Sequence, residues 1–152
     1  MNIMLAYDGS RNAKLALAQT ISMFRKLDPH LRLVAVAENP RDITDANDEL
    51  FQEEWRELDV FLDEALEFAR NEGVSAEKVL VEGDARKMLW RATQKFEPDL
   101  LVIARHSQKP DGGIIANSLN YFVDELDYMT FGSVSSFLAR RVECPLLILP
   151  SP

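Results

Sequence analysis

The sequence predicts a single α/β domain in which a parallel sheet of five strands is covered by helices on both faces. Short apolar runs alternate with longer stretches whose apolar residues recur at helical spacing, which is typical of strands joined by crossover helices. The strands are apolar throughout, as expected when both faces of a parallel sheet are buried. The length of 152 residues suits one domain and is too short for two ordinary ones.

Composition excludes several classes of protein. Lys and Arg number 17 against 25 Asp and Glu, so the net charge is −8, and this acidic balance argues against a nucleic-acid or anionic-membrane binder. The single cysteine rules out a disulfide framework within the chain. No apolar run is long enough to span a membrane, and no basic segment followed by an apolar one opens the sequence. We therefore expect a cytoplasmic protein.

The first half of the chain contains two strands and two helices. Residues 2–7 form an apolar run that ends at a turn, after which Ser10 can cap a helix with apolar residues at helical spacing over 13–24. A second strand is expected over 31–37, and the polar stretch that follows it is a loop or a ragged helix start. A long helix then has its apolar face over 51–69.

The second half repeats the alternation. Gly73 is placed to end the long helix in the left-handed conformation, and Asp84 can cap the next one. The remaining predicted elements are a strand over 79–81, a helix over 85–96, a strand over 100–104, a helix opening at Gly132-Ser133 and a last strand over 146–149.

The candidate site lies beyond the carboxyl ends of the strands, where ligands bind in open sheets of this kind. A helix N-terminus at the same edge would add unpaired N–H groups and a positive dipole end for an anion. The candidate residues are Ala6, Tyr7 and Asp8 after the first strand, Ala37 after the second, Ala104, Arg105 and His106 after the fourth, and Gly132, Ser133 and Val134 at the last helix.

Four segments carry a family resemblance, namely residues 3–10, 82–85, 98–103 and 131–149. In this order they resemble the universal stress protein family over nearly the whole chain. The resemblance implies a flavodoxin-like fold, similar to adenine-nucleotide α-hydrolases, with strand order 3-2-1-4-5. It also implies a homodimer paired through the strand over 146–149, whose apolar edge would otherwise be exposed.

The resemblance further implies how a nucleotide would bind, and this chain departs from the family's pattern at the phosphate-binding loop. In the nucleotide-binding branch, the first-strand Asp and the end of the second strand hold the adenosine, and Gly-x-x-Gly, nine residues, then Gly-Ser/Thr cradles the phosphates. Counting back from Gly132, the two earlier glycines are replaced by Leu119 and Phe122. Bulky side chains hinder the approach of backbone N–H groups to an anion, and the carboxylates of Asp124, Glu125 and Asp127 would repel phosphates.

Several of these residues have two interpretations. Asp8 holds an adenosine or caps the first turn, and Ser133 binds phosphate or caps its helix. His106 lies at the mouth of the predicted cleft or is merely exposed. A hydrolytic trio of Ser10, His106 and Asp8 lacks the Gly-x-Ser-x-Gly elbow, so we expect no enzyme. Trp90 falls off the inner face of its helix, where it contacts a partner or is half-covered by neighbours.

The sequence therefore supports two functional hypotheses. The first is a non-enzymatic, dimeric stress-response regulator with weakened or lost ATP binding, which contacts a partner protein through the atypical insertion over 105–131. The alternative is a sensor that binds an adenine nucleotide, whether AMP, cyclic AMP or ATP, because fewer phosphates meet less repulsion. A slow ATPase is a weaker third hypothesis. No metal-ligand spacing is present.

Overall fold

The computed structural model describes residues 1–38, 45–105 and 133–150, with the backbone alone for 45–48. The described chain forms one parallel sheet in the order β3-β2-β1-β4-β5, which confirms the α/β class and the strand order. The strands are β1 (Asn2–Ala6), β2 (His30–Ala37), β3 (Ser75–Glu82), β4 (Leu100–Ala104) and β5 (Leu146–Leu149). The helices are α1 (Arg11–Phe24), the 3-10 turn η1 (Arg25–Leu27), α2 (Asp45–Asn71), α3 (Ala85–Phe96) and α5 (Ser133–Arg141).

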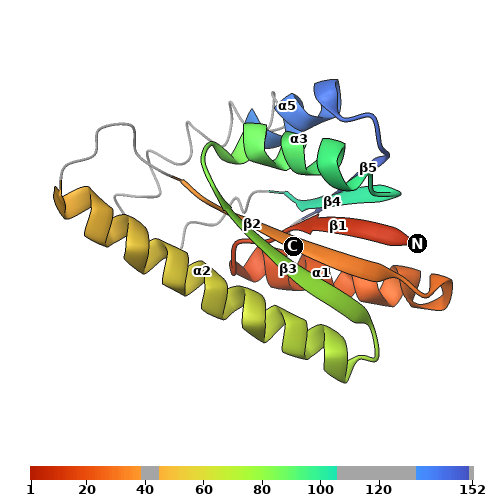
Figure 1. Ribbon diagram of the computed structural model, residues 1–152. Coiled ribbons are helices and arrows are strands. Elements are labelled where there is room, and N and C mark those ends of the chain that lie inside the picture. The colour runs from red at the N-terminus through yellow and green to blue at the C-terminus, as the bar shows by residue number, and fades with distance from the viewer. Residues whose placement is uncertain (39–44, 106–132, 151–152) are drawn as a thin grey trace, which may run out of the picture.

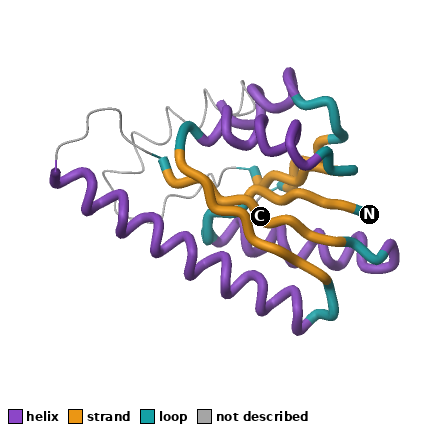
Figure 2. The backbone as a smooth tube through the Cα atoms, in the orientation of Figure 1, coloured by secondary structure: helices purple, strands orange, loops and turns teal. Residues whose placement is uncertain are grey.

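Helices cover both faces of the sheet, so the molecule has three layers. Helices α1 and α2 lie on one face and α3 and α5 on the other (Figures 1 and 2). Successive strand residues point to opposite faces, and Ile3 and Leu5 accordingly pack toward α1 and α2 while Met4 packs toward α3 and α5. The strand order reverses at β1, which is the central strand and pairs with both β2 and β4.

Local sequence signals explain the two helices on the first face. Ser10 caps α1, with its Oγ accepting a hydrogen bond from the Ala13 N–H at 3.2 Å. The buried stripe of α1 includes Thr20, whose hydroxyl donates to the Ala16 carbonyl at 2.7 Å and so leaves no unsatisfied polar group there. Helix α2 is 27 residues long, and Gly73, at φ +75°, follows its end as predicted.

Strand β3 is longer than the sequence predicted. The apolar run covers only Val79–Val81, but β3 pairs with β2 along all eight residues from Ser75 to Glu82. As an edge strand β3 tolerates polar side chains, and the Lys78 ammonium binds the carboxylates of Asp59 and Asp63 on α2 at 2.9 and 2.6 Å. The hydrogen bonds that Lys78 donates to Asp63 and Asp59 raise the pKa of Lys78. The prediction of a short strand was therefore wrong at both ends.

The second face is closed by packing between α3 and α5. Asp84 caps α3 and accepts a hydrogen bond from the Lys87 N–H at 3.1 Å, which with Arg86 holds the pKa of Asp84 below its usual range. Trp90 packs edge-on against Phe137 of α5, with ring centroids 6.4 Å apart. Trp90 is therefore half-covered within its own molecule. No helix in the described ranges is long and apolar enough to cross a membrane.

Candidate functional site

The structure brings together the ends of β1 and β4, the two central strands on either side of the point where strand order reverses. Leu5 of β1 is in register with Val102 of β4, so both strands end at the same edge of the sheet. The Asn12 side-chain amide, in the first turn of α1, donates to the Arg105 carbonyl at 3.3 Å. This contact ties the turn that follows β1 to the residue that follows β4, which is the arrangement expected for a ligand site at a switch point.

The turn after β1 uses its polar side chains to cap α1. One carboxylate oxygen of Asp8 accepts a hydrogen bond from the Ser10 N–H at 2.9 Å, and Ser10 Oγ accepts from Ala13 as described above. Asp8 itself is exposed, so its carboxylate also faces solvent at the carboxyl end of the sheet. Of its two interpretations, the capping role is present in the structure and leaves room for the binding role.

Phe61 of α2 covers this turn, a contact that sequence reasoning missed. Gly9 lies at φ +77°, and a Cβ built on it would stand 2.3 Å from Cδ2 of Phe61. Only glycine fits, because the backbone is left-handed and the aromatic ring occupies the space of a side chain. Phe61 lies one turn from the buried Leu58 and Ala65, and this spacing could have placed it against the core.

Tyr7 is buried at the end of β1, and its pKa depends on the charged groups around the site. Its N–H donates to the Val34 carbonyl at 2.8 Å, and its ring belongs to the core beneath α1 and α2. Burial raises the pKa of Tyr7 to about 12, with further contributions from the charges of Glu64 and Asp8. Two carboxylates thus create a negative potential next to the first strand.

The other candidate residues lie at the same edge in different roles. Ala37 is fully buried, and its carbonyl accepts from the Gly83 N–H at 3.0 Å. Arg105 is exposed, and its N–H donates to the Leu149 carbonyl at 2.8 Å. The remaining candidates are Ala104, which packs toward α1 and α2; Ala6 and Val134, which pack into the core beneath α3 and α5; Ser133, exposed as the first residue of α5; and His106 and Gly132, which lie outside the described residues.

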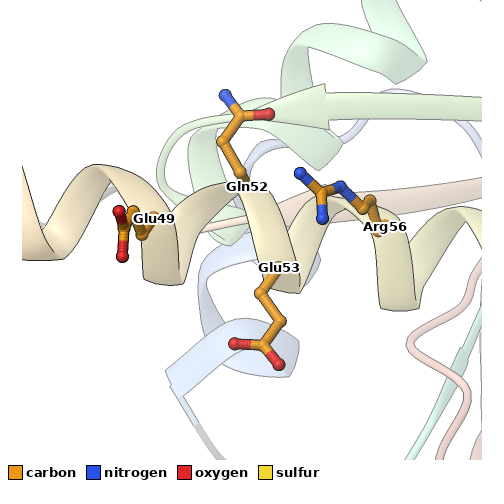
Figure 3. A pocket seen from close by; sticks show the side chains of 4 residues that line it. All are labelled: Glu49, Gln52, Glu53 and Arg56. Atoms are coloured by element: carbon orange, nitrogen blue, oxygen red, sulfur yellow. The ribbon is translucent and has the colours of Figure 1, made fainter.

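The hollow in Figure 3 lies on the first half of α2. Its described lining consists of Glu49, Gln52, Glu53 and Arg56, which all lie on one face of the helix, with Gln52 and Glu53 pointing in opposite directions (Figure 3). Two carboxylates against one guanidinium make this hollow a poor site for an anion. Within residues 1–38, 45–105 and 133–150, no group of three or more His, Cys, Asp or Glu could hold a metal ion.

Comparisons with known proteins agree with this architecture. A family model described as the universal stress protein family matches residues 1–150. A universal stress protein from Lactobacillus plantarum is similar in structure, with 14% identity, a TM-score of 0.76, and 98% of this chain and 97% of that chain covered. A family protein from Burkholderia pseudomallei is 24% identical, with a TM-score of 0.68 and coverage of 99% and 96%.

A third similar structure carries a ligand. It is a universal stress protein family protein from Arabidopsis thaliana, solved with AMP bound. It is 17% identical to this chain, with a TM-score of 0.67, and the match covers 100% of this chain and 92% of that one. No match was found among the curated protein sequences.

Proposed function

The chain belongs to the universal stress protein family, and from this premise we propose that it is a non-enzymatic, dimeric stress-response regulator. In this proposal ATP binding is weakened or lost, and the protein acts by contacting a partner protein through the insertion over residues 105–131.

The observation that carries the proposal is the pair of residues at the positions of the phosphate-loop glycines. Leu119 and Phe122 stand where the nucleotide-binding branch has glycine, at the family's spacing from Gly132. Backbone N–H groups can approach a phosphate only where side chains are small. A triphosphate would therefore lose the hydrogen bonds on which its binding depends.

The described part of the site supports the same conclusion. In addition to burial, the carboxylate of Glu64 raises the pKa of Tyr7 and adds negative charge next to the first strand, beside that of Asp8, the residue that corresponds to the adenosine-holding Asp of the nucleotide-binding branch. Phe61 covers the turn at Gly9 from the side of α2. Repulsion from each carboxylate within reach is on the order of 1 kcal/mol or more per phosphate charge in a partly screened cleft, which disfavours ATP most among the adenine nucleotides.

A non-enzymatic role is supported by the capping geometry of the first turn. Asp8 and Ser10, the two members of the possible hydrolytic trio that lie in the described chain, both take part in capping α1. A serine nucleophile instead needs its hydroxyl directed at a general base. We therefore infer that neither residue takes part in a hydrolytic reaction.

A homodimer through β5 is supported by the contrast between the two edges of the sheet. Edge strand β3 carries Glu77, Lys78 and Glu82 and is further protected by the bridge from Lys78 to α2. Edge strand β5 reads Leu-Leu-Ile-Leu and carries no charge. Charged edges resist pairing with another chain, whereas an uncharged apolar edge favours it.

The second candidate is a sensor of an adenine nucleotide with fewer phosphates. The Arabidopsis relative was solved with AMP, and another universal stress protein of this fold was solved in complex with cAMP. In this chain Asp8 and Ser133 remain exposed at the ends of β1 and at the start of α5. A monophosphate would meet less repulsion there than a triphosphate.

Calorimetric titration of the nucleotide-free protein with ATP, AMP and cyclic AMP, with and without Mg²⁺, separates the two candidates. We expect no ATP binding tighter than about 100 μM, which corresponds to roughly 5.5 kcal/mol. Binding of AMP or cyclic AMP above that strength, abolished by Asp8→Ala, would establish the sensor instead. Lys26→Ala, a change at an exposed residue of η1, is the control for nonspecific loss.

Restoring the two glycines tests directly whether Leu119 and Phe122 prevent ATP binding. We expect the double variant L119G/F122G to gain ATP affinity by at least tenfold, about 1.4 kcal/mol, because the backbone amides become accessible. The matched control L119A/F122A removes most of the same bulk but keeps a Cβ and lacks glycine's backbone freedom, so it should gain less. Equal ATP affinity in the wild type and both variants would show that these positions do not limit nucleotide binding.

A further inference from the structure

Charge is unevenly distributed among the helices of this protein. Helices α3 and α5 contain no acidic residue, and every basic side chain on them is exposed. We call this surface the basic face, and its charged members are Arg86, Lys87, Arg91, Lys95, Arg140 and Arg141.

The opposite layer contains a surface of the opposite charge. Residues 49–71 of α2 carry eight acidic side chains and only two basic ones. Its exposed side also presents large apolar groups, with Leu50 63%, Val60 54% and Phe68 40% exposed. Carboxylates interleaved with exposed apolar groups are unlike a purely solvated helix face. We call this surface the acidic face, and it comprises Leu50, Glu53, Glu57, Val60, Glu64, Glu67 and Phe68.

The basic face has a preorganised aromatic centre. Two guanidinium groups lie near the Phe137 ring, with Cζ of Arg141 4.0 Å and Cζ of Arg86 5.9 Å from its centroid, and Arg86 also pairs with Asp84 at 3.4 Å. Trp90 packs against the edge of the same ring. Cation–π contacts of this kind hold the arginines in place, so binding a carboxylate costs them less conformational entropy than it costs a free side chain.

The two faces cannot meet within one molecule. They lie on opposite sides of the sheet (Figure 2), separated by two packing layers of roughly 10 Å each. That separation exceeds the Debye length of about 8 Å at physiological ionic strength. Each face therefore acts on its own surroundings, and the net charge of −8 does not cancel the local attraction of the basic face.

We propose that the basic face of one copy binds the acidic face of α2 in a second copy. The two surfaces are opposite in charge, and each combines its charged groups with apolar or aromatic ones, namely Leu50, Val60 and Phe68 on the acidic face and Trp90 and Phe137 on the basic face. The contact joins two different surfaces, so it is head-to-tail and extends beyond a closed pair. It is additional to the β5 dimer and does not depend on it.

Sedimentation velocity of the full chain over a range of concentrations tests this contact. We expect assemblies larger than the dimer at about 50 mM salt and their loss at about 500 mM, because the contact is mainly electrostatic. A β5 dimer is apolar and should persist at both salt concentrations. Absence of the dimer at both salt concentrations would therefore contradict the dimer in the proposed function. Absence of larger assemblies at low salt would contradict only this inference.

Charge-reversal variants identify the two faces. R91E/R140E alters the basic face and E57K/E67K the acidic face, at exposed positions that form no ion pair within the described chain. Each variant alone should weaken the low-salt assembly at least about tenfold. An equimolar mixture should restore association, because a reversed basic face then meets a reversed acidic face. The control K14E/K26E makes the same charge change as R91E/R140E on α1 and η1 and should assemble like the wild type.

Three results would overturn the proposal. The first is low-salt assembly that survives both reversals. The second is equal loss in K14E/K26E, which would indicate a net-charge effect. The third is a mixture that stays dissociated while R91E/R140E alone loses binding to a DNA duplex, which would assign the basic face to nucleic acid. Far-ultraviolet circular dichroism and thermal unfolding of each variant confirm that it is folded.

Discussion

Gly9 and Gly73 share a backbone conformation but differ in what surrounds them. Their φ angles are +77° and +75°, yet a Cβ at Gly9 would meet Phe61 at 2.3 Å and a Cβ at Gly73 would meet nothing within 4 Å. Gly73→Ala should cost about 1–2 kcal/mol from left-handed strain, and Gly9→Ala about 1–3 kcal/mol more from overpacking. Urea unfolding of both variants measures the difference.

A double-mutant cycle assigns that extra cost to the aromatic ring. If Phe61 is the obstacle, Gly9→Ala in a Phe61→Ala background should cost no more than Gly73→Ala does. An unchanged cost in that background would place the obstacle in the backbone instead.

Tyr7 makes stability depend on pH at the alkaline end. Its pKa of about 12 in the folded protein exceeds the ordinary value of about 10, so between these values the unfolded chain loses a proton that the folded chain keeps. The free energy of unfolding therefore falls as pH rises through this window, by up to roughly 2–3 kcal/mol. Tyr7→Phe lacks this term, and its urea unfolding curve should change less from pH 9 to 11.5. Parallel pH dependence in the two proteins would contradict the assignment.

The sequence predicted which residues surround the site better than it predicted the contacts between these residues and the packed helices. Asp8 and Arg105 could be placed because each lies just beyond the end of a strand, and strand ends gather at one edge, while Ser10 could be placed as the N-cap of the helix that follows. The packing of Phe61 on Gly9 joins a residue inside α2 to the turn before α1. It depends on how α2 is rotated about its axis relative to the sheet. The strand and helix periods alone do not fix that rotation.

Strand β5 offers an outward edge whose hydrogen-bonding groups can be removed one at a time. The carbonyls of Pro145 and Leu149 accept from Leu101 of β4 and from Arg105, the residue after β4, so alternate residues of β5 face β4. The N–H of Ile148 therefore points away from β4, toward the side where the proposed dimer would place a second copy. Ile148→Pro should shift the protein from dimer to monomer without breaking the β4–β5 ladder.

Sedimentation at micromolar concentration checks this prediction. Ile148→Val is the control, because it keeps the N–H and the apolar edge and should remain a dimer. A dimeric Ile148→Pro variant with normal thermal stability would show that the subunits pair through another surface.

Strands made of apolar residues could be predicted from sequence, including the edge strand β5 over 146–149, whereas the bounds of the polar edge strand β3 could not. Strand β4, which lies between β1 and β5, was predicted with its observed bounds of Leu100–Ala104 because all of it is apolar. Strand β3 was predicted too short because its residues 75–78 contact solvent and α2 instead of being buried in a core, so hydropathy does not mark them as a strand. Hydropathy reports burial, and at an edge strand the hydrogen-bond ladder decides the length.

The whole molecule is bipolar although it is acidic overall. Its isoelectric point is about 4.8, yet the basic face concentrates six positive side chains on α3 and α5. At pH 7 and low salt we expect retention on a cation exchanger as well as on an anion exchanger. R91E/R140E should lose the first and keep the second, whereas K14E/K26E should keep both. Passage of the wild type through the cation exchanger would contradict this picture of the surface.

The central position of β1 also has a kinetic consequence. One edge of β1 pairs with the nearby β2, but the other pairs with β4, and the Asn2 N–H bonds to Asp99 across 97 positions of sequence at 2.7 Å. During synthesis at about 5–20 residues per second, that second edge stays open for about 5–20 s. Such distant pairing slows folding, and a chain interrupted after β3 would present the apolar edge of β1 to other nascent chains. Chaperone demand should therefore peak before β4 leaves the ribosome.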